Sequence, residues 1–529
     1  MTDEPDGGIP HDVVERINAG GVTALEHVAA GDLPAATAVY RELLALIETI
    51  ESNPDVVFVR AHLLGALAGL MYDQGRLASS ATAFQEAYEL AMSVADEPMG
   101  PNGRLSWLDT TITILIGYAE TIHKTAEFDT ANQLLDQAER LIDELGDAGD
   151  RSAQLNTTRA TLLMSKGDWA RAEQLLVVTI DTTDPDSPSL GYLHTMLGRT
   201  YAFTRRLDDA EDQFQQAADA FAAMPWPVPT GELLADRANL AQQRGDNDTA
   251  TTLYTEAAAE FTRLGRDGDL AICQQALATL ATDGDTADQL LMDSLRRFTE
   301  LDMSLAAADT MILIGRRAFD RGDVYATHHY LTTARKNYHR HGIQERCAQI
   351  DYLFAAAIET GLENGAHDAH ERKAVDEALA ATLPAALYLE SVRYDFASGH
   401  ARAQWLALAE EAMNLAFRLA LRRGDQGLLF ELVEFRCAGA PLSLASPTEP
   451  TSLEELPDTD VHPDGGGEPS HSLGRAAAEA AASEGLRVGP PPGIVMSAGF
   501  GRIALSEYID TARERYGVPI IGPERTNSW

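Results

Sequence analysis

The chain has 529 residues, enough for several domains or for one long repeat array. It carries 41 basic and 81 acidic residues, and the net charge of −40 argues against binding to nucleic acids or anionic membranes, which need clustered positive charge. Apolar residues make up 45% of the chain and aromatic residues only 7%, a composition typical of closely packed helices.

Cysteine usage and the N-terminus indicate the compartment. The cysteines Cys273, Cys347 and Cys437 lie far apart without CxxC spacing, so we predict neither a disulfide framework nor a zinc knuckle. The first six residues are acidic in character, whereas a signal peptide begins with basic and then apolar residues, and no run of about eighteen apolar residues follows. We therefore expect a cytoplasmic protein without a membrane span.

A helical repeat runs through the first two thirds of the chain. Its signature is a small residue, a bulky residue four positions later, and usually a small residue three positions after that. Such positions share one face of a helix, so each triplet predicts one buried stripe. The stripes are Ala36/Tyr40/Leu43, Ser80/Phe84/Ala87, Ala131/Leu135/Ala138, Ala172/Leu176/Thr179, Ala210/Phe214/Ala217, Ala250/Tyr254/Ala257, Ala287/Leu291/Ser294 and Ala326/Tyr330/Thr333. Their first members are 44, 51, 41, 38, 40, 37 and 39 residues apart, which indicates a repeat array.

Turn residues five positions before most stripes divide each repeat into two helices. Glycine stands there as Gly31, Gly75, Gly167 and Gly245. A glycine at this place can adopt the left-handed conformation that ends a helix. Arg205 and Ala126 replace it in two repeats, where we expect less regular turns.

The repeat at residues 197–217 resembles the tetratricopeptide repeat. The family's consensus is matched by Leu197-Gly198-x-x-Tyr201 in the first helix and by Ala210, Phe214 and Ala217 in the second. The resemblance implies an all-α fold, a right-handed superhelical solenoid of helical hairpins, and we assign about eight hairpins to residues 1–340. The spacing near 40, against about 34 in the family, predicts longer helices or longer turns.

The first helix of each hairpin is expected to line the concave groove, where such solenoids bind partners. From the repeat register we place nine residues on this face: His62, Tyr72, Glu120, His123, Gln154, Tyr192, Arg199, Asn239 and Gln243. Repeat proteins that clamp the terminal carboxylate of a peptide use a Lys/Asn/Arg array on this face, and this set lacks one. We therefore expect the groove to hold an internal peptide segment or a folded partner.

Residues 341–439 are predicted to continue the solenoid as helices, although the repeat triplet fades. We expect helices at 401–423, closed by Gly424, and at 426–436. This region resembles the helices beside caspase-like CHAT peptidase domains in repeat proteins of high-GC bacteria. The resemblance rests on Arg402, Trp405, Ala409-Glu410, Leu419-Ala420, Gly424-Asp425, Leu429 and Glu431-Leu432-Val433-Glu434-x-Arg436. It implies a partner such as a caspase-like peptidase or another effector in a bacterial conflict or defence system.

The remaining chain is too short and too polar for a peptidase domain. Residues 440–492 are rich in proline, glycine and acidic residues, so we predict a disordered linker. Residues 493–529 form a short tail, with one helix at 503–516 and an extended segment at 518–521. Leu505, Ile509 and Ala512 would share one face of that helix, which either docks a partner or folds back on the solenoid.

Motifs for catalysis are missing from the sequence. None of the four lysines follows a glycine, so no GxxxxGK phosphate loop is present, and neither a GxSxG elbow nor an HExxH zinc helix occurs. His367, His370 and Glu371 could place three metal ligands on one helical face, but a surface cluster beside a loop is the better interpretation. We predict no catalytic residue, cofactor or metal.

Our leading hypothesis is a non-enzymatic scaffold or adaptor that binds a partner protein in the solenoid groove. The alternative is a regulatory module that senses a small ligand and controls a partner's activity. A hydrolase hidden near Cys437 or His367 is a third hypothesis. An enclosed apolar pocket would favour the sensor, and an open polar groove would favour the scaffold. The sequence does not indicate the oligomeric state.

Overall fold

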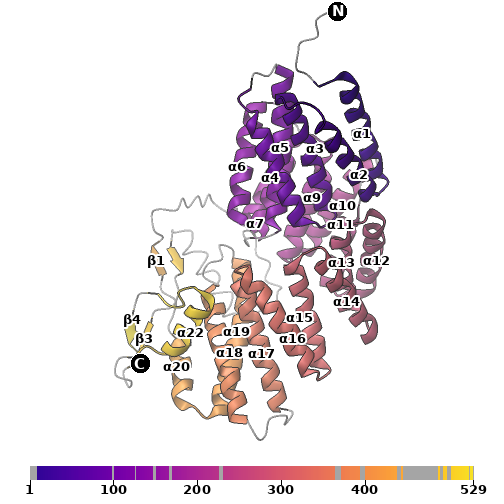
Figure 1. The fold of residues 1–529 in the computed structure, drawn as a ribbon. Coiled ribbons are helices and arrows are strands. Elements are labelled where there is room, and N and C mark those ends of the chain that lie inside the picture. The colour runs from indigo at the N-terminus through magenta and orange to yellow at the C-terminus, as the bar shows by residue number, and fades with distance from the viewer. Residues whose placement is uncertain are drawn as a thin grey trace, which may run out of the picture. The chain divides into compact units, whose positions relative to one another are not determined.

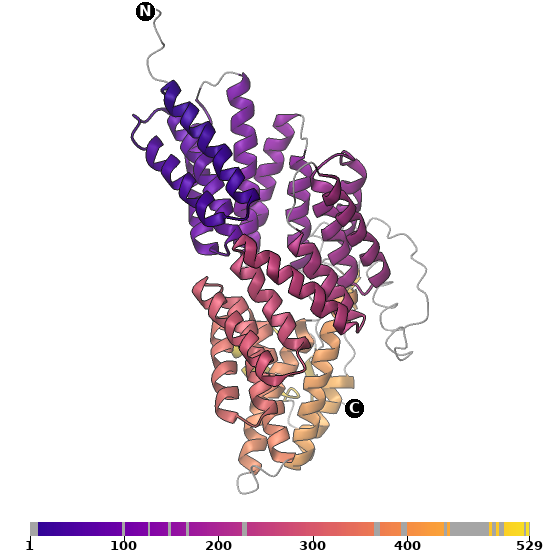
Figure 2. The same cartoon turned by 90° about the vertical axis from the view of Figure 1, so that its right-hand side faces the viewer.

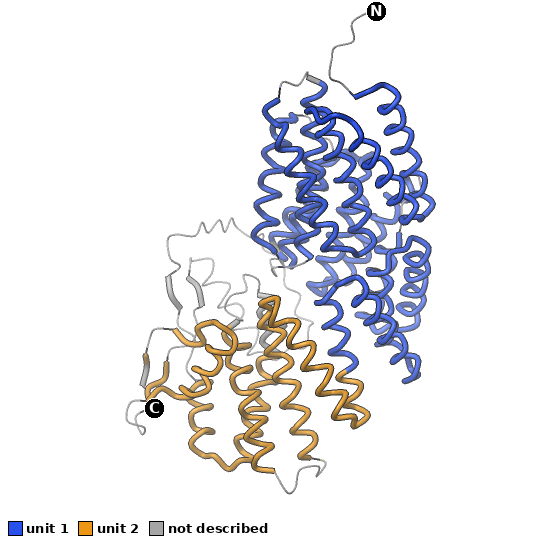
Figure 3. Tube along the Cα trace, in the orientation of Figure 1, with its two compact units in different colours: residues 1–314 blue, residues 315–529 orange. Residues whose placement is uncertain are grey.

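The computed structural model describes residues 9–97, 101–124, 127–146, 150–165, 169–224, 230–363, 371–392, 399–437, 442–444, 486–488, 493–496, 502–522 and 525–527. The expected turns at Ala126 and Gly167 lie outside these residues, as does most of the linker 440–492. The chain divides into two compact units, Met1–Ile314 and Gly315–Trp529, which we describe separately (Figure 3).

Unit 1 consists of consecutive helices (Figures 1 and 2). They are α1 (His11–Ala29), α2 (Leu33–Ile47), α3 (Pro54–Asp73), α4 (Leu77–Ser93), α5 (Pro101–His123), α6 (Phe128–Leu145), α7 (Arg151–Ser165), α8 (Trp169–Thr182), α9 (Ser189–Phe203), α10 (Leu207–Ala223), α11 (Gly231–Gln243), α12 (Asn247–Leu264), α13 (Asp267–Leu280) and α14 (Gly284–Glu300). The next helix, α15 (Ser304–Asp320), contains the boundary between the units.

The helices pair into antiparallel hairpins, from α1/α2 to α13/α14. The first helices of successive hairpins also contact one another, in the order α3, α5, α7, α9 and α11, and so form one layer. The second helices, such as α10 and α12, pack between neighbouring first helices. The chain is therefore an all-α solenoid of helical hairpins, as the repeat pattern predicts.

The predicted stripes form the core of the hairpins. In seven of them the small residues are buried, and Phe214 in the fifth is 1% exposed. A side chain at Gly198 would place its Cβ 2.5 Å from the Phe214 ring, so this glycine is what lets α9 approach α10. The eighth prediction was wrong by one residue, because Thr327 and Ala334 are buried in α16 (Val324–Arg340) instead of Ala326 and Thr333.

The turns within hairpins are more uniform than predicted. Gly31, Gly75 and Gly245 have φ angles of 80°, 75° and 80°, the left-handed conformation that ends the first helix. Arg205 has a φ angle of 66° in the same place, so a non-glycine residue forms the same turn at some cost in free energy. The expectation of a less regular turn at Arg205 was therefore wrong.

Helix α3 is long and rich in apolar residues. By length and composition it would satisfy the requirements of a membrane span. Its apolar residues are nevertheless core residues of unit 1: Leu64, Leu67 and Ala68 are buried against α4 and α5. This burial is the ordinary environment of a core helix in a helical-repeat protein.

Unit 2 continues with helices that pack in sequence order. They are α16, α17 (Gln344–Glu363), α18 (Glu371–Val392), α19 (Gly399–Arg423), α20 (Gln426–Cys437) and the tail helix α22 (Ser506–Tyr516). Helix α18 contacts α17, α19 and α22. Gly424, with a φ angle of 73°, ends α19 where the sequence predicted.

Short strands in unit 2 were not predicted. Strands β1 (Leu442–Leu444) and β2 (Leu486–Val488) pair antiparallel, and β3 (Gly493–Val495) pairs parallel with β4 (Arg525–Asn527). Each has only three residues, too few for an alternating pattern to be recognised in a sequence.

The tail helix α22 is anchored on unit 2 by a buried hydrogen-bond network. The Tyr516 hydroxyl donates a hydrogen bond to Asp351 Oδ2 at 2.7 Å, and its ring lies 4.6 Å from that of Tyr388. Arg335 donates two further hydrogen bonds to Asp351, at 2.7 and 2.9 Å. Burial and the neighbouring Asp351 carboxylate raise the pKa of Tyr516 far above its usual value, so the phenol keeps its proton. The tail therefore folds back on its own chain.

We predict that Tyr516→Phe loosens the tail while preserving its apolar packing. The substitution removes one hydrogen bond to the charged Asp351 carboxylate, and a hydrogen bond to a charged group contributes about 1.5–3 kcal/mol. Hydrogen exchange should become faster at the amides of residues 506–516. Tyr325→Phe, at a residue that is 84% exposed, is the control and should leave this exchange unchanged. Equal protection of α22 in both variants would contradict the anchoring role of the hydroxyl.

Candidate functional site

The hairpins of unit 1 curve far enough for early and late ones to meet. A Cβ atom built at Gly31, in the α1–α2 turn, would lie 3.0 Å from the carbonyl oxygen of Arg263 near the end of α12. A Cβ at Gly75, in the α3–α4 turn, would lie 3.1 Å from the Leu301 side chain. The first helices of the hairpins therefore face one another across the interior of unit 1, which we call the lumen.

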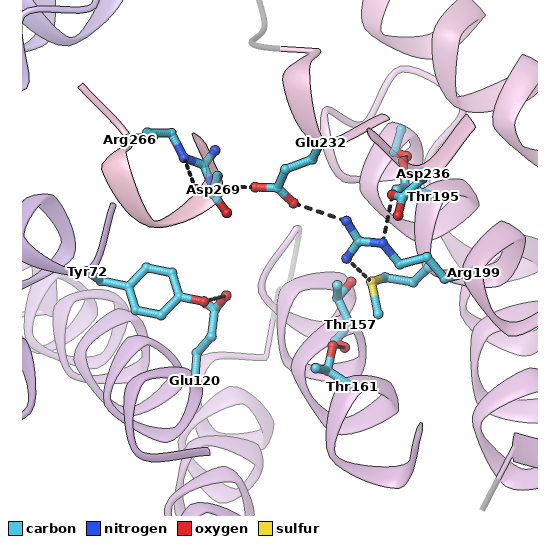
Figure 4. A network of polar contacts seen from close by, with 12 residues as sticks. Tyr72, Glu120, Thr157, Thr161, Thr195, Arg199, Glu232, Asp236, Arg266 and Asp269 are labelled. Atoms are coloured by element: carbon cyan, nitrogen blue, oxygen red, sulfur yellow. Dashed lines mark hydrogen bonds and ion pairs between the residues drawn. The ribbon is translucent and has the colours of Figure 1, made fainter. Parts of the chain in front are cut away.

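A chain of charged groups crosses one side of the lumen (Figure 4). Arg199 of α9 donates hydrogen bonds to Asp236 at 2.7 Å and to Glu232 at 3.3 Å, both on α11. Glu232 in turn accepts a hydrogen bond from Arg266 at 2.7 Å, and Arg266 also donates to Asp269 of α13 at 2.7 Å. Three successive hairpins are thus connected by alternating charges.

A second polar pair lies on the facing wall. Tyr72 of α3 donates a hydrogen bond to Glu120 of α5 at 2.8 Å. Figure 4 shows this pair opposite the side chains of Arg266 and Glu232. Charged groups of that wall act on the pKa values of this pair. Glu232 contributes to the raised pKa of Tyr72, and Arg266 lowers the pKa of Glu120 against the effect of burial. The two walls therefore belong to one site.

The side chains of the lumen lie deep in the protein and still reach water. The Glu232 side chain is 45% exposed, although protein surrounds it. Desolvation would raise the pKa of Glu232, but the guanidinium groups of Arg199 and Arg266 outweigh it and lower the pKa to about 2. At Asp236, whose side chain is 19% exposed, desolvation prevails over Arg199 and raises the pKa to about 6. A water-accessible groove with charged walls explains both observations.

The lumen holds more acidic than basic groups. Its carboxyl groups are those of Asp73, Glu120, Glu232, Asp236 and Asp269, against the cations Arg199, Arg266 and Lys124. Burial raises the pKa of Glu120 and of Asp269, and it raises that of Asp73 to about 6. The cations of the lumen therefore do not neutralise all of the negative charge of its carboxylates.

Of the nine groove residues predicted from the sequence, four come together in this site. Tyr72, Glu120 and Arg199 belong to the contacts described above. Tyr192 of α9 is 50% exposed, and its pKa is raised by burial and by the charges of Glu232 and Asp73. These four residues come from three helices that are distant in the sequence.

The other five groove residues contact residues of their own helix or of a neighbouring hairpin. His62 Nδ1 lies 3.5 Å from Thr110 Oγ1, and His123 Nε2 lies 2.7 Å from Ser165 Oγ. In each case the contacted residue belongs to the first helix of the next hairpin. Burial lowers the pKa of both histidines, that of His123 to about 4, so both are neutral at pH 7.

Gln154 and Gln243 each accept a hydrogen bond from an arginine, Arg151 at 2.9 Å and Arg205 at 3.1 Å respectively. The exposed Asn239 accepts a hydrogen bond from Gln243 at 2.7 Å. The part of these five residues in partner binding stays a prediction.

Six lumen residues were missed: Asp73, Lys124, Glu232, Asp236, Arg266 and Asp269. The repeat register contained a signal for two of them. Gln154, Tyr192, Glu232 and Asp269 are separated by 38, 40 and 37 residues, the same steps as the stripes of their hairpins. Applying the register of Tyr192 to the next two hairpins would have found Glu232 and Asp269.

The cysteines and potential metal ligands of the described residues bear on the hypothesis of a hidden hydrolase. No group of three potential metal ligands occurs among them. Burial raises the pKa of the Cys273 thiol to about 12 and that of Cys347 to about 11, so neither is a thiolate nucleophile at neutral pH. His367, His370 and the side chain of Cys437 lie outside the described residues.

Comparisons with known proteins find likenesses of architecture. No protein-family model matches the chain, and no curated protein does. A Rap protein complexed with Competence and Sporulation Factor is 13% identical over 64% of this chain and 98% of its own, with a TM-score of 0.41. The human IFIT1 dimer with PPP-AAAA is 14% identical over 81% of this chain and 90% of its own, also with a TM-score of 0.41.

A third similar structure is a Signal Transduction ATPase with Numerous Domains from Pyrococcus horikoshii, which has a tetratricopeptide repeat sensor. It is 9% identical over 74% of this chain and 62% of its own, with a TM-score of 0.41. At such values these likenesses carry no inference about what the present chain binds. The site itself has to supply the functional argument.

The raised pKa of Asp73 predicts that this residue destabilises unit 1 at neutral pH. A folded-state pKa of about 6, above the ordinary 3.8, means that the folded state binds the proton more tightly. The contribution of this group to stability is complete below about pH 4 and is lost as the pH rises through 6. Asp73→Asn should therefore raise the free energy of unfolding at pH 7 by about 1–2 kcal/mol, after discounting for water in the lumen.

Thermal unfolding between pH 4 and 7 measures this effect. The gain of Asp73→Asn over the unsubstituted protein should be larger at pH 7 than at pH 4. Asp181→Asn, on the exposed surface of α8, is the matched control and should show no such gain. A variant at Asp73 that unfolds at a lower temperature at pH 7 would show that the carboxylate stabilises the fold.

Proposed function

We propose that this protein is a non-enzymatic scaffold that holds a segment of a partner protein in the lumen of unit 1. The observation that carries the proposal is the convergence of charged and aromatic side chains from α3, α5, α9, α11 and α13 on a water-accessible interior. Such a surface offers hydrogen bonds and ion pairs to an extended chain from several directions.

The polar character of the lumen favours a protein segment over a small apolar ligand. The described residues include a cavity of about 320 Å³ between α10 and α11, lined by Phe221, Leu233, Leu234 and their neighbours. This volume is at the lower limit for pockets that bind drug-sized molecules, about 300–1,000 Å³. Control by a small ligand is thus the less supported alternative.

The charge of the lumen also favours a protein over a nucleic acid. Phosphates would face the carboxylates of Asp73, Glu120 and Asp269, and the arginines Arg199 and Arg266 are already engaged by acidic partners. Release of counterions from a phosphate backbone requires free lysine and arginine side chains. Repulsion would therefore weaken such a complex.

The identity of the partner is a proposal that rests on the sequence resemblance. The helices α19 and α20 contain the residues that resemble those beside CHAT peptidase domains. We propose accordingly that the partner is a caspase-like peptidase or another effector of a bacterial conflict system, and that the two meet in the cytoplasm. The chain would then supply recognition and its partner the enzymatic activity.

We predict that Tyr192→Ala weakens capture of the partner by about tenfold or more. Aromatic residues at the centre of interfaces often contribute 2 kcal/mol or more to binding, and Tyr192 presents half of its surface on the lumen wall. Asn239→Ala, on the neighbouring hairpin, should reduce capture to a smaller extent. Affinity purification from the native host with quantitative mass spectrometry measures capture for each variant.

Two controls separate binding from stability. Tyr325→Ala and Gln133→Ala remove an exposed tyrosine and an exposed amide that lie outside the lumen, and both should retain capture. The thermal midpoint of each variant is compared with that of the unsubstituted protein. Undiminished capture by folded Tyr192→Ala and Asn239→Ala proteins would place the binding surface elsewhere.

A further inference from the structure

Asp73 differs from the other described carboxylates of the lumen. It is the last residue of α3, next to Tyr72, and its carboxylate forms neither a hydrogen bond nor an ion pair with any described residue. Glu120 accepts from Tyr72, while Glu232, Asp236 and Asp269 each accept from an arginine. Protein surrounds Asp73 on nearly all sides, although part of its surface reaches the water of the lumen.

The Asp73 carboxylate is recessed but partly accessible, so the water of the lumen is the hydrogen-bond donor that is left to it. Polar groups inside native proteins are nearly always hydrogen-bonded, because an unsatisfied group loses its hydration without compensation. The charges around Asp73 increase this cost: Glu120, Glu232 and Asp269 repel it, and Arg266 is the cation that opposes them. Because Arg266 is already bound to Glu232 and Asp269, the part of the chain that the structure describes supplies no hydrogen-bond donor to Asp73.

The missing group is a cation with hydrogen-bond donors. Glu120 uses Oε1 to accept from Tyr72, so its other oxygen is available to a donor as well. The described residues include no group of three ligands that could bind a metal ion, which indicates an organic cation. Lysine and arginine side chains fit this position, because their long apolar stems allow the charge to reach a recessed carboxylate.

We propose that the partner segment inserts a lysine or arginine side chain into the lumen, where its charge pairs with Asp73 beside Glu120 and Tyr72. This inference rests on the proposed function and specifies its ligand: a segment of protein chain with a basic residue at its centre. The pairing would compensate the excess of carboxylates on this wall. Selectivity for basic segments follows, since an acidic or apolar side chain would leave Asp73 without a donor.

The test uses peptides selected on the full-length protein. Displayed random 12-residue peptides are selected for binding, and the recovered sequences are compared with the unselected library. Synthetic versions are then titrated calorimetrically against the unsubstituted protein, Asp73→Asn and the matched surface control Asp181→Asn. In each peptide the basic residue is also replaced, arginine by citrulline or lysine by norleucine.

We expect recovered peptides to be enriched in lysine or arginine at one position. Asp73→Asn should weaken their binding about tenfold or more, whereas Asp181→Asn should leave the dissociation constant unchanged. The neutral peptide should bind the unsubstituted protein as weakly as the basic peptide binds Asp73→Asn, and combining both changes should add little further loss. Since Asp73→Asn is expected to unfold at a higher temperature, weaker binding would not result from unfolding.

Other outcomes overturn the inference in distinguishable ways. Peptides that bind in the lumen without basic enrichment, or basic peptides that bind Asp73→Asn unchanged, would refute the pairing with Asp73 and leave the scaffold function intact. Recovery of no binding peptide, together with undiminished partner capture by the Tyr192→Ala protein, would refute both the pairing and the proposed function.

Discussion

Close approach of the two helices in each hairpin determines where every side chain of the lumen lies. A ring such as Phe214 fits against a bare glycine backbone, Gly198, and small residues on either side of it bring the paired helices together. The first helices are thereby held in one layer with a constant register from hairpin to hairpin. Side chains that are about 40 residues apart in the sequence consequently stand side by side on the lumen wall, which is how Tyr192 and Glu232 come together.

The same architecture explains why the lumen can be charged. The buried apolar stripes hold the two helices of each hairpin together. The inner face can therefore carry charged groups that lower the stability of the fold. Glu232 is stabilised as an anion by two arginines, whereas Asp73 and Asp236 lose more hydration than they recover, which raises the pKa of both to about 6. Charged groups that lose hydration without full compensation are common at binding sites, where the ligand supplies the compensating interaction.

Sequence reasoning recovered the parts of the molecule that repeat and missed those that occur once. The buried stripes and hairpins follow from helical periodicity, and so does the placement of Tyr72, Glu120 and Arg199 on the inner face. Arg266 lies in the turn before α13, where helical periodicity does not predict the direction of a side chain. Its position opposite Tyr72 and Glu120 depends on the curvature of several successive hairpins.

The one-residue error at the eighth stripe has a similar origin, because Thr327 and Ala326 are both small and fit the pattern equally well. The tail contact to Asp351 joins residues 165 positions apart, which no local pattern encodes.

That separation has a consequence for synthesis of the chain. Ribosomes add about 5–20 residues per second, so roughly 8–33 s pass between the appearance of Asp351 and that of Tyr516, which is 165 residues later. During this interval α16 and α17 can pair through Arg335, but the surface of α18 that receives α22 stays uncovered. The hairpins of unit 1 depend on contacts with near neighbours in the sequence and can fold as they emerge. Unit 2 can therefore complete its packing only after its tail has been synthesised.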